Sequence, residues 1–171
     1  LFAPNSEPPS AYATAMMDST LWLLAWNYEL QDFVAQEVFD FKKQSNSIMP
    51  LEIYFDRNLE RVFITTAEPG SLHILNISDG MHKPSLVKDV RAYGGSHHVA
   101  ITKDEKLAFV QNGLLNIPGI NDGSITVIDL INYEVLDNIE TFKNKGLAIN
   151  SITLLPEWYN PAGHINNGRV L

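Results

Sequence analysis

An internal repeat with a period near fifty residues constrains the fold of this chain more than any other feature. Two regular copies align, residues 50–77 and residues 97–129. Each copy has an apolar segment ending near an Asp, a second segment rich in β-branched and aromatic residues, and a Gly-Ser pair that leads a third, alternating segment. The offset between the copies is 48 residues in the first half and 53 in the second, so one loop differs in length. In such architectures, each unit buries its faces only against its neighbours.

Each regular copy predicts a four-stranded antiparallel sheet. The fourth strands are expected at 86–90 and 135–141, after turns at Asp79-Gly80 and Asn132-Tyr133. A period of this length built from short strands is typical of a β-propeller blade. The predicted fold class is therefore all-β, a β-propeller segment of about three and a half four-stranded antiparallel blades.

An earlier copy over residues 10–41 is less regular. Its inner strand is expected at 11–17 and its outer strands at 30–34 and 37–41. A helix over 21–41 is the alternative, because this stretch contains few helix breakers. The register of the repeat favours strands.

A fourth copy, residues 147–171, is incomplete. Residues 150–154 match the inner strand of the second regular copy, and residues 168–171 resemble the opening of a second strand. A strand cut at its start leaves backbone donors and acceptors unpaired. We therefore expect residues 1–171 to form a partial propeller whose remaining blades come from another chain, a second copy or a parent segment. The expected blades are 10–41, 48–91, 95–142 and the incomplete 147–171.

Charge and composition exclude several classes of protein. The 20 acidic residues outnumber the 12 Lys and Arg residues, and the resulting net charge of −8 disfavours nucleic acid as a partner. The chain has no cysteine, which excludes disulfides, thiolate metal sites and cysteine nucleophiles. The longest apolar run, residues 21–26, is far shorter than the roughly 20 residues of a membrane helix, so no membrane span is expected.

The second regular copy resembles the YVTN repeat of bacterial and archaeal β-propellers. Val110-Gln111-Asn112 stands where that family has Val-Thr-Asn, and Ile128-Asp129 stands where it has Ile-Asp. The first copy departs from the pattern, since Ile64-Thr65-Thr66 lacks the Asn and Leu75-Asn76 replaces Ile-Asp. The resemblance covers about residues 48–155 well and implies a propeller fold.

The same resemblance is nearly silent on function. The repeat serves surface-layer proteins, periplasmic binding proteins and the propeller domains of haem-d1 nitrite reductases and copper nitrous oxide reductases. It therefore implies a periplasmic or extracellular location, and fold analogy cannot choose among the activities.

His97 and His98 are the first candidates for chemistry. They follow Gly94-Gly95-Ser96 at the start of an inner strand. Adjacent strand residues point to opposite faces, so only one of the two is expected to face the propeller axis. Imidazole suits copper, iron and zinc, and the resemblance implies histidine ligands at this position. The alternative is a structural role, in which one imidazole hydrogen-bonds a neighbouring blade.

His164 is the third candidate metal ligand. It lies in the loop of the incomplete copy, beside Trp158 and Tyr159, and would approach the same face if that loop folds over it. The alternative is an exposed loop histidine with no ligand.

The insertion at residues 111–122 is a candidate contact surface. It is rich in Gly, Pro and Asn, the residues of turns, yet it carries four large apolar side chains. Loops on a rigid scaffold commonly carry binding. The residues expected to contact a ligand or protein partner are Asn112, Leu114, Leu115, Asn116, Ile117, Trp158 and Tyr159.

Two classes of function stay open. One is a propeller segment that serves as a protein- or ligand-binding scaffold. The other is part of a metal- or haem-dependent redox enzyme with a histidine site at the propeller axis, for which copper or haem iron is the candidate cofactor. The sequence has no nucleophile motif and no phosphate-binding Gly-rich loop that would favour another enzyme class.

The repeat also predicts a core and two turn residues. Asp56 and Asp104 are expected to close hairpins by accepting backbone hydrogen bonds. The positions expected to be largely buried are Ile53, Val62, Ile74, Val99, Ile101, Phe109, Ile125 and Val127.

Overall fold

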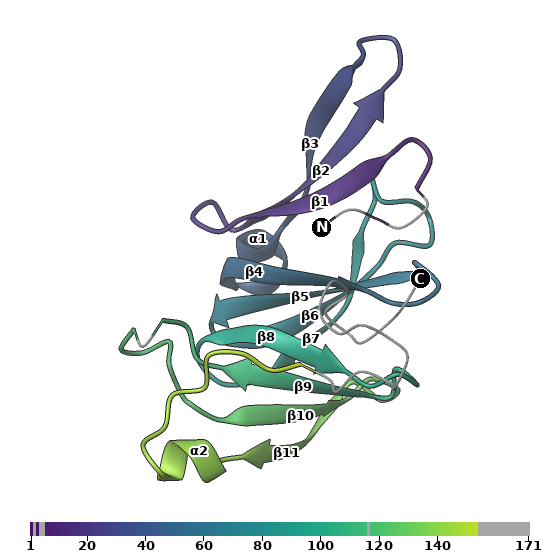
Figure 1. Cartoon of the computed structure of the whole chain (residues 1–171). Helices are drawn as coiled ribbons and strands as arrows, with labels where there is room; N and C mark the ends of the chain where they lie inside the picture. Colours follow the sequence, from purple (N-terminus) through teal and green to yellow (C-terminus); the bar gives the residue numbers. More distant parts are fainter. Residues whose placement is uncertain (2, 4–5, 116, 154–171) are drawn as a thin grey trace.

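A computed structural model describes residues 1, 3, 6–115 and 117–153 of the chain. These residues form three antiparallel sheets that stack face to face in chain order (Figure 1). Consecutive blades of a β-propeller have this arrangement. The predicted fold class, an all-β propeller segment, is confirmed.

The first sheet contains β1 (Ser10–Ala15), β2 (Thr20–Asn27) and β3 (Asp32–Asp40), in that order. The prediction of two outer strands, 30–34 and 37–41, was wrong, because β3 is one strand that pairs along the whole of β2. The residues between the two predicted strands, Ala35-Gln36, include no turn former that would interrupt it. This sheet therefore has three strands, and the alternative helix over 21–41 does not form.

A short helix, α1 (Phe41–Ser45), follows β3 directly. Asp40 caps it by accepting a hydrogen bond from the Lys43 N–H at 2.9 Å, and Asn46 ends it with a φ of 52°. The predicted strand end at Phe41 was wrong because Asp is a strong N-cap residue and starts a helix at this point. The fully buried Phe41 ring packs edge-on against Phe39, with the ring centroids 4.9 Å apart.

The second and third sheets each have four strands. The second contains β4 (Ile48–Phe55), β5 (Arg61–Glu68), β6 (Ser71–Asn76) and β7 (Ser85–Arg91). The third contains β8 (Ser96–Ile101), β9 (Leu107–Asn112), β10 (Ile125–Asp129) and β11 (Glu134–Ile139).

The predicted C-terminal elements are shorter than expected. The strand predicted at 135–141 ends at Ile139, because a one-turn helix, α2 (Thr141–Asn144), begins two residues later. Residues 147–153 form no strand, so the described part of the predicted fourth copy lacks its inner strand. The rest of that copy lies outside the described residues.

Both predicted turn aspartates close hairpins as expected. Asp56 Oδ1 accepts hydrogen bonds from the backbone N–H groups of Glu60 and Arg61, at 2.8 and 3.0 Å. Asp104 Oδ1 accepts from Thr102 Oγ1 at 2.7 Å and from Lys106 N at 3.3 Å. The aspartates recur in the repeat because the turn needs a short acceptor next to its own backbone.

Two hydrophobic cores hold the sheets together, one on each face of the second sheet. Along β5, Val62 and Ile64 face the first sheet, while Phe63 faces the third. Because both of its faces are covered, β5 is buried at nearly every position. Seven of the eight positions predicted to be buried are buried, and Phe109 alone is partly exposed.

The first strands of the three sheets, β1, β4 and β8, lie beside one another (Figure 1). Each of them is an edge strand of its own sheet. Together they form the inner edge of the stack, the side that surrounds the axis in a propeller. Among the described residues, no helix has both the length and the apolar character needed to cross a bilayer.

Candidate functional site: a Glu-His-His cluster on the inner strands

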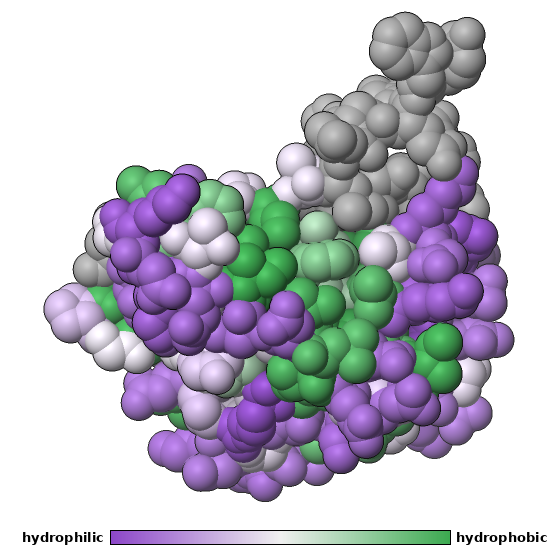
Figure 2. Space-filling view, turned by 90° about the horizontal axis from the view of Figure 1, so that it is seen from below, coloured by the Kyte–Doolittle hydropathy of each residue, from purple (hydrophilic) through white to green (hydrophobic). Residues whose placement is uncertain are grey.

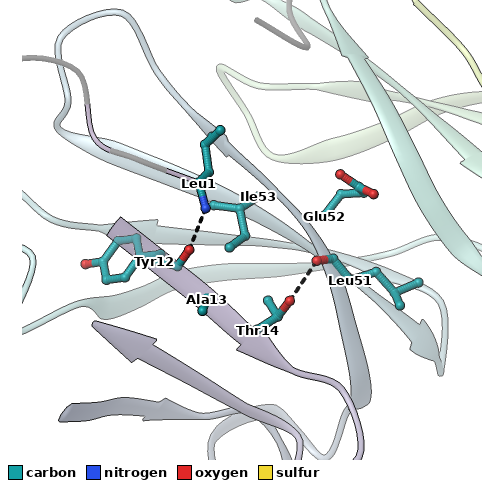
Figure 3. Close-up of a pocket in the computed structure, with 7 residues that line it drawn as sticks. All are labelled: Leu1, Tyr12, Ala13, Thr14, Leu51, Glu52 and Ile53. Carbon is teal, nitrogen blue, oxygen red and sulfur yellow. Dashed lines mark hydrogen bonds between the residues drawn. The ribbon is translucent and has the colours of Figure 1, made fainter. Parts of the chain in front are cut away.

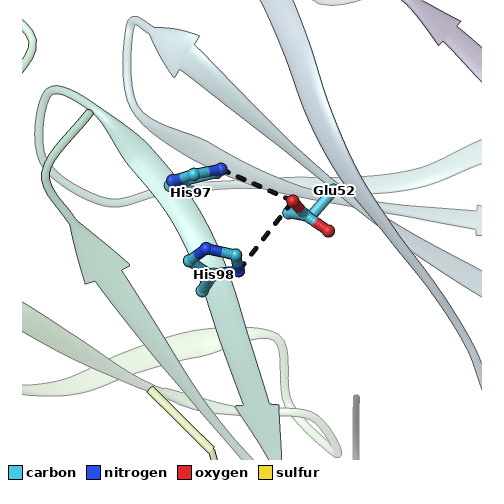
Figure 4. Close-up of side chains that lie close together, drawn as sticks. All are labelled: Glu52, His97 and His98. Carbon is cyan, nitrogen blue, oxygen red and sulfur yellow. Dashed lines mark ion pairs between the residues drawn. The ribbon is translucent and has the colours of Figure 1, made fainter. Parts of the chain in front are cut away.

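Three side chains from β4 and β8 converge on the inner edge. Glu52 lies on β4, and both His97 and His98 lie at the start of β8 (Figure 4). Glu52 Oε1 is 3.4 Å from His97 Nε2 and 3.9 Å from His98 Nδ1. Within the described ranges, these residues form the one group of three or more His, Asp and Glu side chains whose ligand atoms all lie within 4.8 Å of one another.

A β-bulge in each strand brings the three side chains to one side. The register of β8 against β9 shifts between Ser96 and Val99, and the register of β4 against β5 shifts between Pro50 and Ile53. A bulge places an extra residue in one strand and re-aims its side chains. The expectation that only one of the two histidines faces the axis was therefore wrong. Their rings lie side by side, with centroids 4.0 Å apart.

Thr65 on β5 ties the two bulges together. Its hydroxyl oxygen accepts a hydrogen bond from the Glu52 N–H at 3.1 Å and donates one to the His97 carbonyl at 2.8 Å. The Thr65 side chain is fully buried between the second and third sheets. One hydroxyl therefore fixes the backbone of both an acidic and an imidazole residue.

Two further side chains hold the backbone that follows His97. The His98 N–H donates to Gln111 Oε1 at 3.3 Å, and the Val99 N–H donates to the Tyr54 hydroxyl at 2.9 Å. The Gln111 amide in turn donates to the carbonyls of Gly113 and Ile149, at 2.7 and 2.6 Å. The strand that carries the imidazoles is thus positioned by partners whose own geometry is fixed, as a preorganised site requires.

The electrostatics favour a carboxylate next to a neutral imidazole. The hydrogen bond from His97 lowers the pKa of Glu52, with His98 and His97 adding charge attraction. Burial lowers the pKa of His98, and the neighbouring His97 lowers it further. Near neutral pH, the Glu52 carboxylate and the His98 lone pair are both available to a cation. The three side chains are 21–30% exposed, so a solute can reach them.

A groove of about 420 Å³ lies against the same edge, between β1 and β4 (Figure 3). Thr14 crosses it by donating a hydrogen bond to the Leu51 carbonyl at 2.9 Å. Its volume lies in the range of small-molecule sites. Glu52 belongs to both the groove and the cluster, so the two features are continuous. The lining residues are Leu1, Tyr12, Ala13, Thr14, Leu51, Glu52 and Ile53.

The predicted contact loop is partly an internal element. Leu114 packs in a small core with Ala67 and Ile120, whereas Leu115 is 75% exposed and Ile117 is 41% exposed. Asn112 is fully buried. Leu114 and Asn112 are therefore placed inside the protein, whereas Leu115 and Ile117, among the described residues of the predicted contact surface, are available to a partner.

Asn112 is a structural residue of the third sheet. Its side-chain oxygen accepts from Ser96 Oγ at 2.9 Å, and its amide donates to Ser124 Oγ at 3.1 Å and Thr126 Oγ1 at 2.8 Å. All of its side-chain polar groups are thus used within the sheet. The remaining predicted site residues, Asn116, Trp158, Tyr159 and His164, lie outside the described residues.

Sequence reasoning missed Glu52 and Thr65. The signal for Glu52 was a charged residue between Leu51 and Ile53 in an otherwise apolar strand. The signal for Thr65 was the departure of Ile64-Thr65-Thr66 from the repeat pattern. Neither signal identifies its partner, because the contacts join strands of two different blades.

No family model matches the chain. No curated protein matches it either. The YVTN resemblance is therefore an interpretation of the repeat alone.

Solved structures do match. A putative 6-phosphogluconolactonase from Bacteroides fragilis has a TM-score of 0.56 at 13% identity, over 81% of this chain and 38% of that one. The dihydro-heme d1 dehydrogenase NirN has a TM-score of 0.53 at 13% identity, over 81% of this chain and 27% of that one. The β-propeller domain of Cps50 (Swd1) from Myceliophteria thermophila has a TM-score of 0.51 at 6% identity, over 78% of this chain and 37% of that one.

These similarities concern the fold alone. The chain spans less than two fifths of the length of each of these three structures. Their names also differ in activity, and one fold hosts many functions. The chain has the β-propeller fold.

Proposed function

We propose that the chain is a segment of a larger YVTN-like β-propeller that acts outside the cytoplasm as a binding scaffold. One observation carries the proposal. The outer face of the third sheet has apolar residues at the same register positions as the face of the second sheet that packs against the third. An outer face of this kind is suited to accept a further blade. The scaffold then presents its ligand site on the inner strands.

The repetition follows from the strand pairing. In the second sheet, Tyr54, Phe63 and Ile74 stand opposite one another across β4, β5 and β6, and all three are buried against the third sheet. In the third sheet, Ala100, Phe109 and Val127 occupy the same row across β8, β9 and β10.

Among the described residues, no further sheet stacks on this outer row. Ala100 and Val127 are nevertheless buried, while Phe109, the counterpart of the fully buried Phe63, is partly exposed. The chain crosses this face where the Ile149 carbonyl accepts a hydrogen bond from Gln111. Figure 2 views the molecule from below, the side on which the third sheet lies in Figure 1, and shows apolar side chains gathered across the middle of that view. Large exposed apolar patches commonly mark interfaces.

The ligand site of the scaffold is the groove between β1 and β4 together with the cluster at Glu52. A pocket of this size with a few convergent polar groups is the usual form of a small-molecule site. Leu115 and Ile117 remain a separate surface for a protein partner, because they are exposed on a loop whose base is packed.

A metal-dependent redox enzyme is the second candidate function, favoured by the Glu52–His97–His98 cluster. Its donor set fits a single copper ion. It does not fit a haem with both imidazoles as axial ligands, because their ring centroids are 4.0 Å apart and no macrocycle fits between them.

Elemental analysis and visible absorption of the purified protein separate the two functions. A binding scaffold predicts no haem or copper absorption band and no change of spectrum on adding dithionite or ferricyanide. A copper or haem band that responds to these reagents would overturn the scaffold in favour of the redox enzyme.

A further inference from the structure

We infer that Glu52, His97 and His98 form a binding site for a divalent first-row transition ion, with Zn²⁺ as the ion that fits best. The inference deepens the proposed scaffold function, because it names the ligand class of the inner-strand site. It rests on four features: the separations of the donor atoms, their chemical types, the bulges that aim them, and the solvent-facing side of the cluster.

The separations approach those of a tetrahedral site. Zinc lies about 2.0–2.2 Å from imidazole nitrogen or carboxylate oxygen, which places two tetrahedral ligand atoms roughly 3.3–3.5 Å apart. Glu52 Oε1 is 3.4 Å from His97 Nε2 and 3.9 Å from His98 Nδ1. Small side-chain rotations would bring the second separation to the tetrahedral value.

The donor types select the ion. Two imidazole nitrogens and one carboxylate oxygen suit zinc and its first-row neighbours, whereas Ca²⁺ and Mg²⁺ take mainly oxygen ligands. A set of two His and one Glu is also the ligand set of known zinc sites that keep a fourth position open.

Hydrogen bonding alone does not explain the arrangement. His97 Nε2 is within hydrogen-bond distance of Glu52 Oε1, but His98 Nδ1 at 3.9 Å is too far. Among the described residues, no hydrogen bond to the His98 ring is found. The bulge therefore turns the His98 ring toward the Glu52 carboxylate although no hydrogen bond joins them. A shared ion would connect the two side chains.

The backbone at both bulges is fixed before any ion arrives. Thr65 bonds Glu52 N and the His97 carbonyl, and Gln111 holds His98 N. Such supporting hydrogen bonds commonly govern metal affinity. Because the cluster is 21–30% exposed and joins the groove at Glu52, the open position of the ion would face solvent and a groove-bound ligand.

The test is a titration of the chelator-treated protein with Zn²⁺ by calorimetry and with Co²⁺ by visible absorption. Wild type should bind one ion, and bound Co²⁺ should show visible d–d bands. His97→Ala and Glu52→Gln should each weaken binding at least about tenfold. His82→Ala is the matched control, because it removes an exposed imidazole outside the cluster and should leave affinity unchanged.

Circular dichroism and thermal melts with chelator present show whether each variant is folded. If a variant unfolds, the His98→Ala variant and the competition of Mg²⁺ and Ca²⁺ against Zn²⁺ decide. Equal affinity in wild type, His97→Ala and His98→Ala, or displacement of Zn²⁺ by equimolar Mg²⁺, would overturn the inference. So would the absence of one-to-one binding in wild type. Any of these results would overturn the ion site but not the scaffold function. A redox-active spectrum would instead overturn the scaffold function but not the ion site.

Discussion

Thr65 is the residue on which the geometry of the cluster depends. Its hydroxyl is fully buried and serves both as acceptor for Glu52 N and as donor to the His97 carbonyl. Removing it would leave two backbone groups without these bonds at the junction of two blades. Buried polar groups that lose their partners are costly, at about 1–3 kcal/mol each.

Thr65→Val should lower the free energy of unfolding by about 2–6 kcal/mol in urea titrations and weaken Zn²⁺ binding about tenfold or more. Valine keeps the shape of threonine and removes only the hydroxyl. Thr66→Val is the control, since Thr66 is equally buried but its hydroxyl donates to the Pro69 carbonyl instead. Equal Zn²⁺ affinity in the two variants would show that Thr65 does not position the cluster.

His73 is a second residue with a distinct electrostatic role. It is fully buried beside Phe41, and its Nε2 lies 2.8 Å from Ser45 Oγ. Burial, with a smaller contribution from Arg91, lowers its pKa to about 4, although Asp89, 3.7 Å away, acts in the opposite direction. Burial outweighs the carboxylate, so the imidazole is neutral in the folded protein at neutral pH.

Acidification should therefore destabilise the protein between about pH 6.5 and pH 4. In this window the unfolded chain takes up a proton at residue 73 and the folded chain does not, so stability falls as pH falls, by up to about 1.4 kcal/mol per pH unit. Urea titrations at several pH values with chelator present measure it. His73→Gln should flatten the dependence, and an unchanged slope in that variant would contradict the assignment.

At the scale of elements, strand existence could be predicted from the sequence and strand irregularity could not. The repeat register located the strands of both regular copies because period and turn residues are local signals. The alternation rule then placed His97 and His98 on opposite faces, and the bulge at the start of β8 defeats that rule. Pro50 in β4 hinted at a matching bulge, since proline cannot donate to a strand ladder.

The loop after β9 was likewise predicted only in part from the sequence. Its apolar character predicted packing, which holds for Leu114 and Ile120 but not for Leu115 and Ile117. The loop packs where the Ile120 backbone lies directly against Gly95. A Cβ added at Gly95 would stand 1.9 Å from the Ile120 carbonyl oxygen. That contact joins two segments that no local pattern connects.

Gly95→Ala should destabilise the protein more than Gly119→Ala does. Both glycines have positive φ, 85° and 88°, which costs alanine about 1–2 kcal/mol. Only at position 95 does the new Cβ also collide with backbone, whereas nothing lies within 4 Å of it at position 119. Urea titrations of the two variants measure the difference. Equal decreases in the free energy of unfolding would show that the loop does not pack against Gly95.

At the scale of the molecule, the two faces of the second sheet explain why the chain stacks as it does. Each face is apolar, and each is covered by a neighbouring sheet. The sequence predicted Phe109 to be buried because the repeat gives it the same register position as Phe63. The register position was correct, but Phe109 is only partly buried, whereas Val127 in the same row is buried.

Sedimentation velocity across a range of protein concentrations tests the central claim, that the outer face of the third sheet is built to receive another blade. Wild type should associate as concentration rises, and Phe109→Lys should shift the protein toward the 19.2 kDa monomer while keeping its circular dichroism. Leu115→Lys is the control, because it places the same charge at a more exposed apolar side chain on the loop. A wild type that stays a compact monomer at every concentration, or equal effects of the two substitutions, would contradict the account.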